Sequence, residues 1–254
     1  NLIEALTGAR LTTTYTRVGG LAHDLTPDFD PRVRAAFKTT RKVVEETHGL
    51  LTHNRIFIDR MKGTGVVSAA DALSYGFTGP CLRASGVNYD VRKARPYLVY
   101  DKLDFTVPLG AGGDNFDRYL VRMQEMEQSM RIVEQCLDGL PSGPINVDDP
   151  RIILPEKEKV YTEMEALIAH FKLLMPGHGI RPPAGEVYLA VEGANGELGF
   201  YIVSDGTDRP YRVRVRPPCF FMMAGLHKMI NGSGVADIVP TFGSVNMIAG
   251  ELDR

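Results

Sequence analysis

The hydrophobic pattern of this 254-residue chain changes its period near Pro183, and this change limits the possible folds more than any other feature. Before Pro183, apolar residues recur at steps of three and four, which places them on one face of an α-helix. After it, apolar and polar residues alternate over 186–192 and 197–204, which is typical of strands. The expected fold class is therefore mainly α with a small antiparallel β element.

Three segments of the first part have the helical pattern. One begins at Asp30, a capping residue followed by proline, and continues to about residue 51. The second covers 115–138, and the third begins near Pro155 and stops before residue 176. Residues 2–6 are typical of the last turns of another helix, so we expect the chain to be N-terminally incomplete. Together these segments predict a bundle-like helical core.

The second part is predicted to contain a hairpin, a further strand and two short helices. Ala194, Asn195 and Gly196 form a strong hairpin signal, and 211–216 alternates as a third strand. Short helices are expected over 220–231 and 235–243. The expected organisation is a helical core (1–183), a β-hairpin and three-strand element (184–216), and C-terminal helices completing the same domain (217–254).

Charge and apolar run lengths exclude several classes of partner. Lys and Arg number 29 against 31 Asp and Glu, so no basic surface for nucleic acid is indicated. The longest apolar stretch, around 219–226, is far shorter than the roughly 18 to 20 residues of a membrane-spanning helix. The three cysteines are widely spaced, which suits a reducing compartment better than a disulfide framework. We therefore expect no nucleic-acid partner and no direct membrane span.

Local motifs reveal no active site. The glycine-rich run 110–113 precedes a helix, but no Walker lysine follows, so a tight start to the helix is the better interpretation. The histidines form no HExxH motif or zinc-spaced cluster. Met123, Met126 and Met130 suit core packing better than a lipophilic channel. These motifs indicate a soluble helical protein that binds no metal.

Whole segments nevertheless resemble a known family. They are Gly8-Ala9-Arg10, 15–20, 73–80, 82–86, 89–93 with Pro96-Tyr97, 113–119, 204–211 and the terminal 250–254. In this order, and over essentially the whole chain, they resemble the hydrogenase-like 49 kDa or D subunit of proton-pumping NADH:quinone oxidoreductase, respiratory complex I.

The resemblance implies a helical core shared with the large subunits of nickel-iron hydrogenases. It implies packing against the small subunit that holds the terminal iron-sulfur cluster, with the quinone pocket between the two, and contact with the membrane-arm subunit where quinone enters. The subunit would lie peripherally on the cytoplasmic side of the bacterial inner membrane. By this resemblance the chain binds no NADH, flavin or metal itself, quinone is the substrate, and this chain alone is expected to be inactive.

The resemblance also assigns positions to the site. The family's quinone-ligating histidine and tyrosine precede the segment that matches Asn1, so no catalytic residue is carried over. Thr12 matches a position near the terminal cluster. The C-terminal segment lines the quinone pocket in the family, which makes a pocket wall of Gly243, Asn246, Met247 and Ile248.

Two of these residues depart from the family pattern. Many members have, in place of Thr12, a histidine whose protonation is coupled to cluster reduction, and threonine takes up no proton near neutral pH. The cluster should therefore be less reducible and its potential less pH-dependent, which favours a low-potential quinone such as menaquinone. Asn246 stands where a carboxylate is common, so one charge beside the pocket is removed.

Two other functions are weighed against this one. A related membrane-bound hydrogenase needs a CxxC pair near 243–250, and that window contains no cysteine to ligate nickel. The other alternative is a non-catalytic scaffold that holds subunits together without touching quinone. Substitution at Ile248 distinguishes a pocket wall from such a scaffold.

Overall fold

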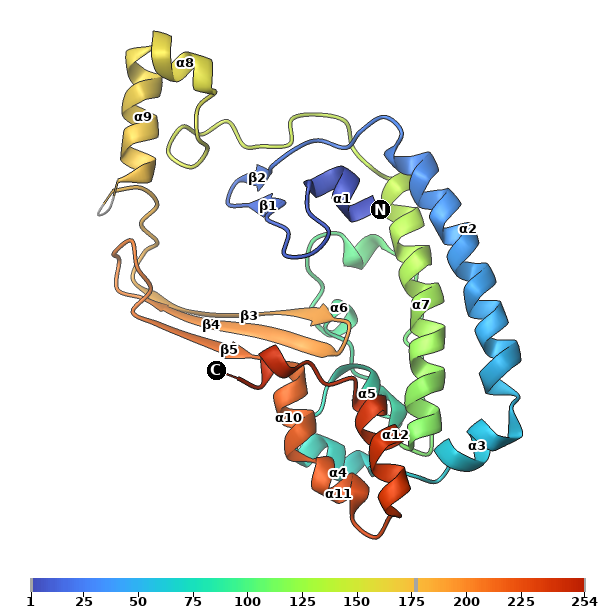
Figure 1. Ribbon diagram of the computed structural model, residues 1–254. Coiled ribbons are helices and arrows are strands. Elements are labelled where there is room, and N and C mark those ends of the chain that lie inside the picture. Colours follow the sequence, from blue (N-terminus) through green and yellow to red (C-terminus); the bar gives the residue numbers. More distant parts are fainter. Residues whose placement is uncertain (1, 176–177, 254) are drawn as a thin grey trace. The chain divides into compact units, whose positions relative to one another are not determined.

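The structure is a computed structural model that describes residues 2–175 and 178–253, and it is mainly helical with two small antiparallel sheets (Figure 1). The helical elements are α1 (Leu2–Thr7), α2 (Phe29–Thr47), η1 (His48–Thr52), α3 (Arg55–Met61), α4 (Ala69–Ser74), α5 (Gly79–Ala84), α6 (Val91–Ala94), η2 (Tyr100–Lys102), α7 (Asn115–Asp138), α8 (Lys157–Thr162), α9 (Met164–Leu174), α10 (Pro218–Ala224), α11 (Leu226–Ile230), α12 (Val235–Val245) and η3 (Ala249–Glu251). One sheet pairs β1 (Thr16–Arg17) with β2 (Gly20–Leu21), and the other has the order β3 (Gly185–Gly193), β4 (Gly196–Ser204), β5 (Arg212–Arg216). The expected fold class is confirmed at this level.

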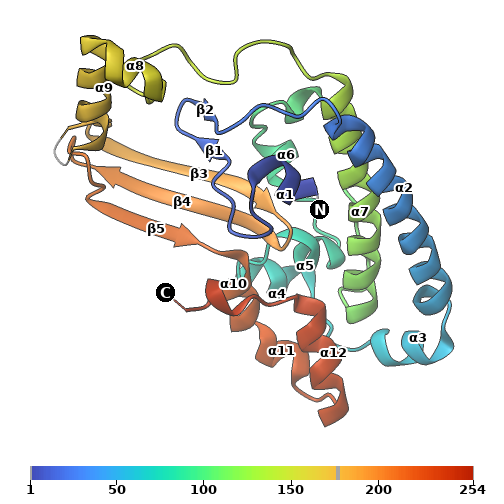
Figure 2. The ribbon, with the colours of Figure 1, turned by 45° about the horizontal axis from the view of Figure 1, so that its top comes forward.

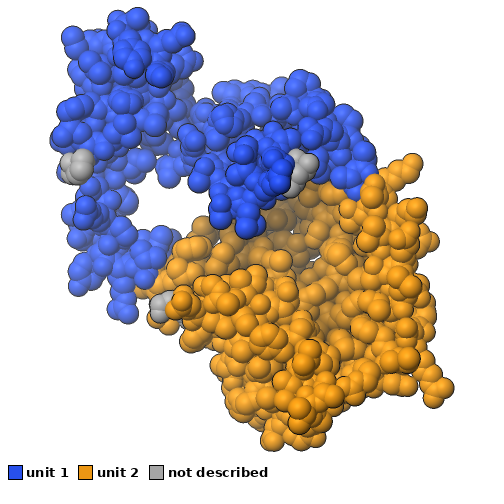
Figure 3. Space-filling view, in the orientation of Figure 1, with its two compact units in different colours: residues 1–36, 139–187, 202–213 blue, residues 37–138, 188–201, 214–254 orange. Residues whose placement is uncertain are grey.

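The chain divides into two compact units (Figure 3). Unit 1 comprises residues 1–36, 139–187 and 202–213, and unit 2 comprises 37–138, 188–201 and 214–254. Unit 2 contains the whole of α7, the hairpin turn and all four residues of the expected pocket wall, whereas Thr12 belongs to unit 1.

In unit 1 the helix expected from residue 155 onward is interrupted. Glu163 has extended backbone angles (φ −121°, ψ 129°), so α8 ends at Thr162 and α9 begins at Met164. The break lets the chain turn sharply between α8 and α9, which contact each other (Figures 1 and 2). The prediction of one continuous helix was wrong. The spacing of apolar residues indicates which residues share a helix face, but it does not reveal a single residue with an extended backbone between two helices.

In unit 2 the helix predicted over 115–138 is confirmed as α7, and Met123 and Met130 are buried along it. Arg41 of α2 joins the two helices: its Nη1 and Nη2 donate to the carboxylate of Glu134 at 2.8 and 2.9 Å, and its Nε donates to Glu127 at 3.1 Å. Paired N–H bonds of this kind fix both distance and orientation. Arg41 of α2 therefore faces α7 and is held there by ion pairs with Glu127 and Glu134.

A buried guanidinium group holds the loops that lead into α7. Arg118 is fully buried, and its Nη1 and Nη2 donate to the carbonyls of Gly113 at 2.8 Å and Gly65 at 2.6 Å. Burial lowers the pKa of Arg118, and these carbonyls replace the water that it loses. Gly113 has φ +65°, and a Cβ there would lie 2.2 Å from the carbonyl oxygen of Val67. The run 110–113 is thus the tight start of a helix, as predicted.

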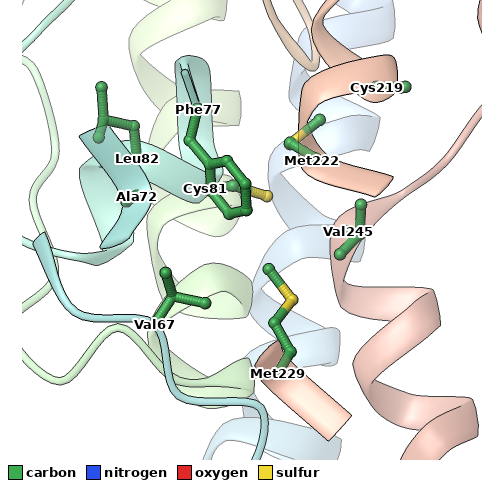
Figure 4. Packing of buried hydrophobic residues seen from close by; sticks show 9 residues of the cluster. All are labelled: Val67, Ala72, Phe77, Cys81, Leu82, Cys219, Met222, Met229 and Val245. Atoms are coloured by element: carbon green, nitrogen blue, oxygen red, sulfur yellow. The ribbon is translucent and has the colours of Figure 1, made fainter. Parts of the chain in front are cut away.

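The hydrophobic core of unit 2 lies between the middle of the chain and the C-terminal helices (Figure 4). It consists of Val67, Ala72, Phe77, Cys81, Leu82, Cys219, Met222, Met229 and Val245. The helix expected over 220–231 is divided into α10 and α11, and that prediction was wrong in extent. The division falls at Gly225, where a Cβ would lie 2.7 Å from the ring of Phe77. Glycine thus lets the chain bend closely around this core residue.

The predicted hairpin is confirmed, with Ala194 and Asn195 as the turn between β3 and β4. The turn rests on the start of α5. Gly196 has φ +134°, and a Cβ there would lie 2.8 Å from the backbone carbonyl carbon of Thr78 and 3.0 Å from the backbone nitrogen of Gly79. Backbone therefore packs directly on backbone where the hairpin meets the helix.

A buried charge cluster holds the same hairpin to α5 and α7. The Arg83 side chain is 1% exposed, and its Nη1 donates to Glu192 of β3 at 2.8 Å while its Nε donates to Glu125 of α7 at 2.7 Å. Burial raises the pKa of Glu192, Asp90 adds to this rise, and Arg83 opposes it. Removing one partner of such a cluster leaves an uncompensated buried charge, so the hairpin turn is firmly fixed in unit 2.

Candidate functional site

The expected pocket wall lies where α12 ends. Asn246 follows Val245 in the left-handed conformation (φ +55°, ψ 48°), and its N–H donates to the carbonyl of Gly243 at 3.1 Å. Asparagine tolerates this conformation better than most non-glycine residues and is a recognised helix terminator. Ile248 is extended and leads into η3. Gly243, Asn246, Met247 and Ile248 are therefore brought together by a single helix end.

The side chain of Asn246 forms a reciprocal amide pair with Asn195 of the hairpin turn. Nδ2 of Asn246 donates to Oδ1 of Asn195 at 2.8 Å, and Nδ2 of Asn195 donates to the backbone carbonyl of Asn246 at 3.1 Å. Asn195 is only 4% exposed, so its amide depends on protein partners to replace water. The hairpin turn is thus hydrogen-bonded to both the side chain and the backbone of Asn246, in the turn that ends α12.

Cys219, at the start of α10, contacts this pair. Asn195 Nδ2 is 3.4 Å from Cys219 Sγ, and the backbone N–H of Cys219 donates to Glu251 Oε2 at 3.0 Å. Burial, with a contribution from the Glu251 carboxylate, raises the pKa of the Cys219 thiol to about 11. The thiol is therefore neutral near pH 7, and it contributes packing rather than charge.

A cation supports the last turn of α12. Arg122 Nη2 donates to the carbonyl of Val245 at 3.3 Å and lies 3.7 Å from Cys81 Sγ. A positive group at a helix C-terminus is favourable because the free carbonyls carry partial negative charge. Arg122 therefore stabilises the end of α12, and its buried Nε has no hydrogen-bond partner among the described residues.

The exposed side of the turn is uncharged. Ile248 is 51% exposed, Asn246 is exposed, and no atom lies within 4 Å of a Cβ built at Gly243, whereas Met247 packs against the core. None of these four side chains gains or loses a proton near neutral pH. The segment can therefore offer apolar contact and amide hydrogen bonding to a ligand, but it cannot itself transfer protons.

Thr12 lies in an exposed bend of unit 1 with φ +43°. A β-branched residue in the left-handed region is a genuine outlier, and such strain is often found at functional sites. Its closeness to a cluster remains an expectation from the resemblance.

A metal site is not formed among the described residues. Residues 2–175 and 178–253 contain no group of three or more His, Cys, Asp or Glu side chains that could hold a metal ion. Over the same ranges, no helix has both the length and the apolar character needed to cross a membrane. A groove of about 1090 Å³ in unit 1 is lined by charged residues as well as by α9, and it contains none of the expected site residues.

Sequence reasoning missed the residues that contact the turn at the end of α12 from other elements. Asn195 was identified only as part of a hairpin signal, and Arg122 and Cys219 were given no role in the site. The Asn195 and Asn246 side chains meet across 51 positions of sequence. No local pattern reports such a contact.

Together, the fold and this site define a mainly helical protein that presents an anchored, uncharged turn at the end of its last α-helix. The whole chain, residues 1–254, matches the family described as respiratory-chain NADH dehydrogenase, 49 Kd subunit. The chain therefore belongs to this family.

Relatives of the chain carry consistent names. It is 55% identical over 249 residues to the D subunit of NADH-quinone oxidoreductase of Myxococcus xanthus, covering 98% of this chain and 60% of that protein. It is 54% identical over 254 residues to the D 1 subunit of Sorangium cellulosum, covering 100% and 62%. A Bdellovibrio bacteriovorus relative, named as the C/D subunit, is 52% identical over 253 residues, covering 100% of this chain and 45% of that protein. The chain thus spans about three fifths of the relatives named as D subunits.

Proposed function

We propose that this chain forms part of the quinone-reduction site of a proton-pumping NADH:quinone oxidoreductase, beside the terminal iron-sulfur cluster of a neighbouring subunit. Family membership and the relatives' names support this proposal. The observation that carries it is the anchored turn at Asn246 and Ile248, which is uncharged and exposed although its base is buried. Ligand pockets combine apolar walls with a few fixed polar groups in this way.

In this proposal the chain positions quinone and does not protonate it. Reduction of quinone to quinol takes two electrons and two protons. The electrons originate from NADH and arrive through the neighbouring cluster. The protons come from groups outside the wall, because Gly243, Asn246, Met247 and Ile248 have none to give near neutral pH. The family's quinone-ligating histidine and tyrosine have no match in residues 1–254.

The setting follows from the same proposal. The chain has a hydrogenase-like helical core, with 184–216 as its β element and 217–254 completing one domain. Its partners are other subunits of the complex, chiefly the small iron-sulfur subunit and the membrane-arm subunit where quinone enters. It lies peripherally on the cytoplasmic side of the bacterial inner membrane. Its quinone is menaquinone, because Thr12 replaces a proton-taking histidine near the cluster.

The test is a bulky substitution in the wall, made in the complete complex. Ile248→Trp should raise the KM for quinone and weaken binding of a quinone-site inhibitor by roughly tenfold or more, since overpacking a binding surface typically costs 1–3 kcal/mol. Val235→Trp, at an 85% exposed position at the start of α12, is the matched control. If Ile248→Trp leaves both values at those of the control in an assembled complex, the chain is a scaffold and not a pocket wall.

A further inference from the structure

The reciprocal amide pair gives Asn195 a specific role. We propose that Asn195 is a positioning residue for quinone binding: through its two hydrogen bonds to Asn246 it holds the left-handed turn that sets Met247 and Ile248 in the pocket wall. This inference rests on the proposed function of that wall. It concerns a residue of the β3–β4 turn, outside the wall itself.

The geometry determines which side chain can stand at position 246. Asn195 Nδ2 is committed to the backbone carbonyl of Asn246, at 3.1 Å, so Asn195 Oδ1 must face the side chain of residue 246. An oxygen acceptor in that place needs a donor opposite it, and Asn246 Nδ2 is that donor, at 2.8 Å. A carboxylate at 246 would set oxygen against oxygen beside a buried amide. The two amides therefore form a matched neutral pair.

The surroundings keep this pair independent of pH in the native protein. Titratable or charged groups near it include Cys219 of α10, Glu251 of η3, Arg122 of α7 and Glu197 of β4. Arg216 of β5 also lies close, and its Nη1 donates to the backbone carbonyl of Glu197 at 2.8 Å. The thiol of Cys219 stays protonated, and the Glu251 carboxylate is bonded to the backbone N–H of Cys219. Arg122 donates to the backbone carbonyl of Val245. The Glu197 carboxylate accepts hydrogen bonds from the hydroxyls of Tyr89 and Tyr188. These bonds leave the amide pair with neutral partners on both sides.

Two isosteric substitutions in the complete complex test the pair. In Asn246→Asp, the carboxyl group is ionised above about pH 4, so it has no proton to donate to Asn195 Oδ1. The KM for quinone should therefore be about three- to tenfold higher than in the wild type from about pH 6 to about pH 8, with kcat changing less. Asn195→Asp should behave alike, because its ionised form has no donor for the Asn246 carbonyl.

The control variant is Asn231→Asp. Asn231 is the exposed C-cap of α11, so this substitution adds the same charge to unit 2 away from the pair. Its quinone KM should follow the wild-type pH profile. NADH oxidation by an artificial acceptor that bypasses quinone normalises each preparation for assembly.

The outcomes separate this inference from the proposed function. A rise in KM for both pair variants with kcat changing less, absent from the control, supports a positioning role. A KM equal to wild type, or a rise that the control shares, overturns that role. If the role is overturned while Ile248→Trp still raises KM, the quinone wall stands without it. If Ile248→Trp also has no effect, the proposed function itself fails.

Discussion

At the scale of single residues, Thr12 occupies a backbone conformation that β-branched side chains rarely adopt, with φ +43°. Histidine and asparagine are among the residues that enter this region more readily. The backbone at this position would therefore accept a histidine. Because threonine is strained in this conformation and histidine tolerates it better, replacing Thr12 with histidine is a favourable experiment.

Thr12→His should raise the midpoint potential of the neighbouring cluster and make it more pH-dependent, by up to about 59 mV per pH unit for a one-electron couple. The reason is that an imidazolium stabilises the added electron and loses its proton as pH rises through its pKa. Redox titration of the cluster in the intact complex, followed by electron paramagnetic resonance, measures both quantities. Thr13→His is the adjacent control, and an unchanged potential and slope in Thr12→His would contradict the placement beside the cluster.

The same scale shows the limits of sequence reading. The resemblance led us to expect a pocket wall at four positions that include Asn246, but it gave no sign of the partner of that residue. Asn195 was assigned to a turn because an asparagine before a glycine has that local meaning. Its tertiary contact depends on where the hairpin meets α12, and nothing in the neighbouring residues encodes that meeting.

At the scale of elements, regular segments could be predicted and interruptions could not. The 24 residues of α7 and the β3–β4 hairpin were located correctly because their periods are sustained. The breaks at Glu163 and Gly225 were missed. Glu163 has a side chain that suits a helix, so its extended backbone leaves no mark in the pattern. Gly225 depends on the ring of Phe77, which is distant in sequence.

The contact between the hairpin and α5 predicts an effect on stability. Gly196→Ala should destabilise the chain by about 1–3 kcal/mol more than Gly143→Ala, measured by urea denaturation of the purified protein. Both glycines have strained angles for alanine, φ +134° and +141°, but an added Cβ lies 2.6 Å from Thr78 at Gly196 and meets nothing within 4 Å at Gly143. The control thus isolates the packing contribution. Equal losses of stability would mean that the hairpin turn does not press on α5.

At the scale of the whole molecule, the family resemblance carried more functional information than any local motif. The chain has no sequence signature of catalysis, and the described residues contain no metal cluster. In the proposed function, the chain contributes a surface that a larger assembly completes, and it matches about three fifths of the relatives named as D subunits. A site shared between subunits has only some of its residues in any one sequence. The fold class could therefore be predicted from this sequence, but the chemistry of reduction could not.

The central claim is that the turn at the end of α12 touches quinone. Photoaffinity labelling of the complete complex with a photoreactive quinone analogue, followed by peptide mapping, tests it most directly. If the turn contacts quinone, the analogue should label this chain within residues 243–248. Unmodified quinone should compete with this labelling, and the labelling should be lost in Ile248→Trp. Competable labelling confined to other subunits or to other parts of this chain would contradict it.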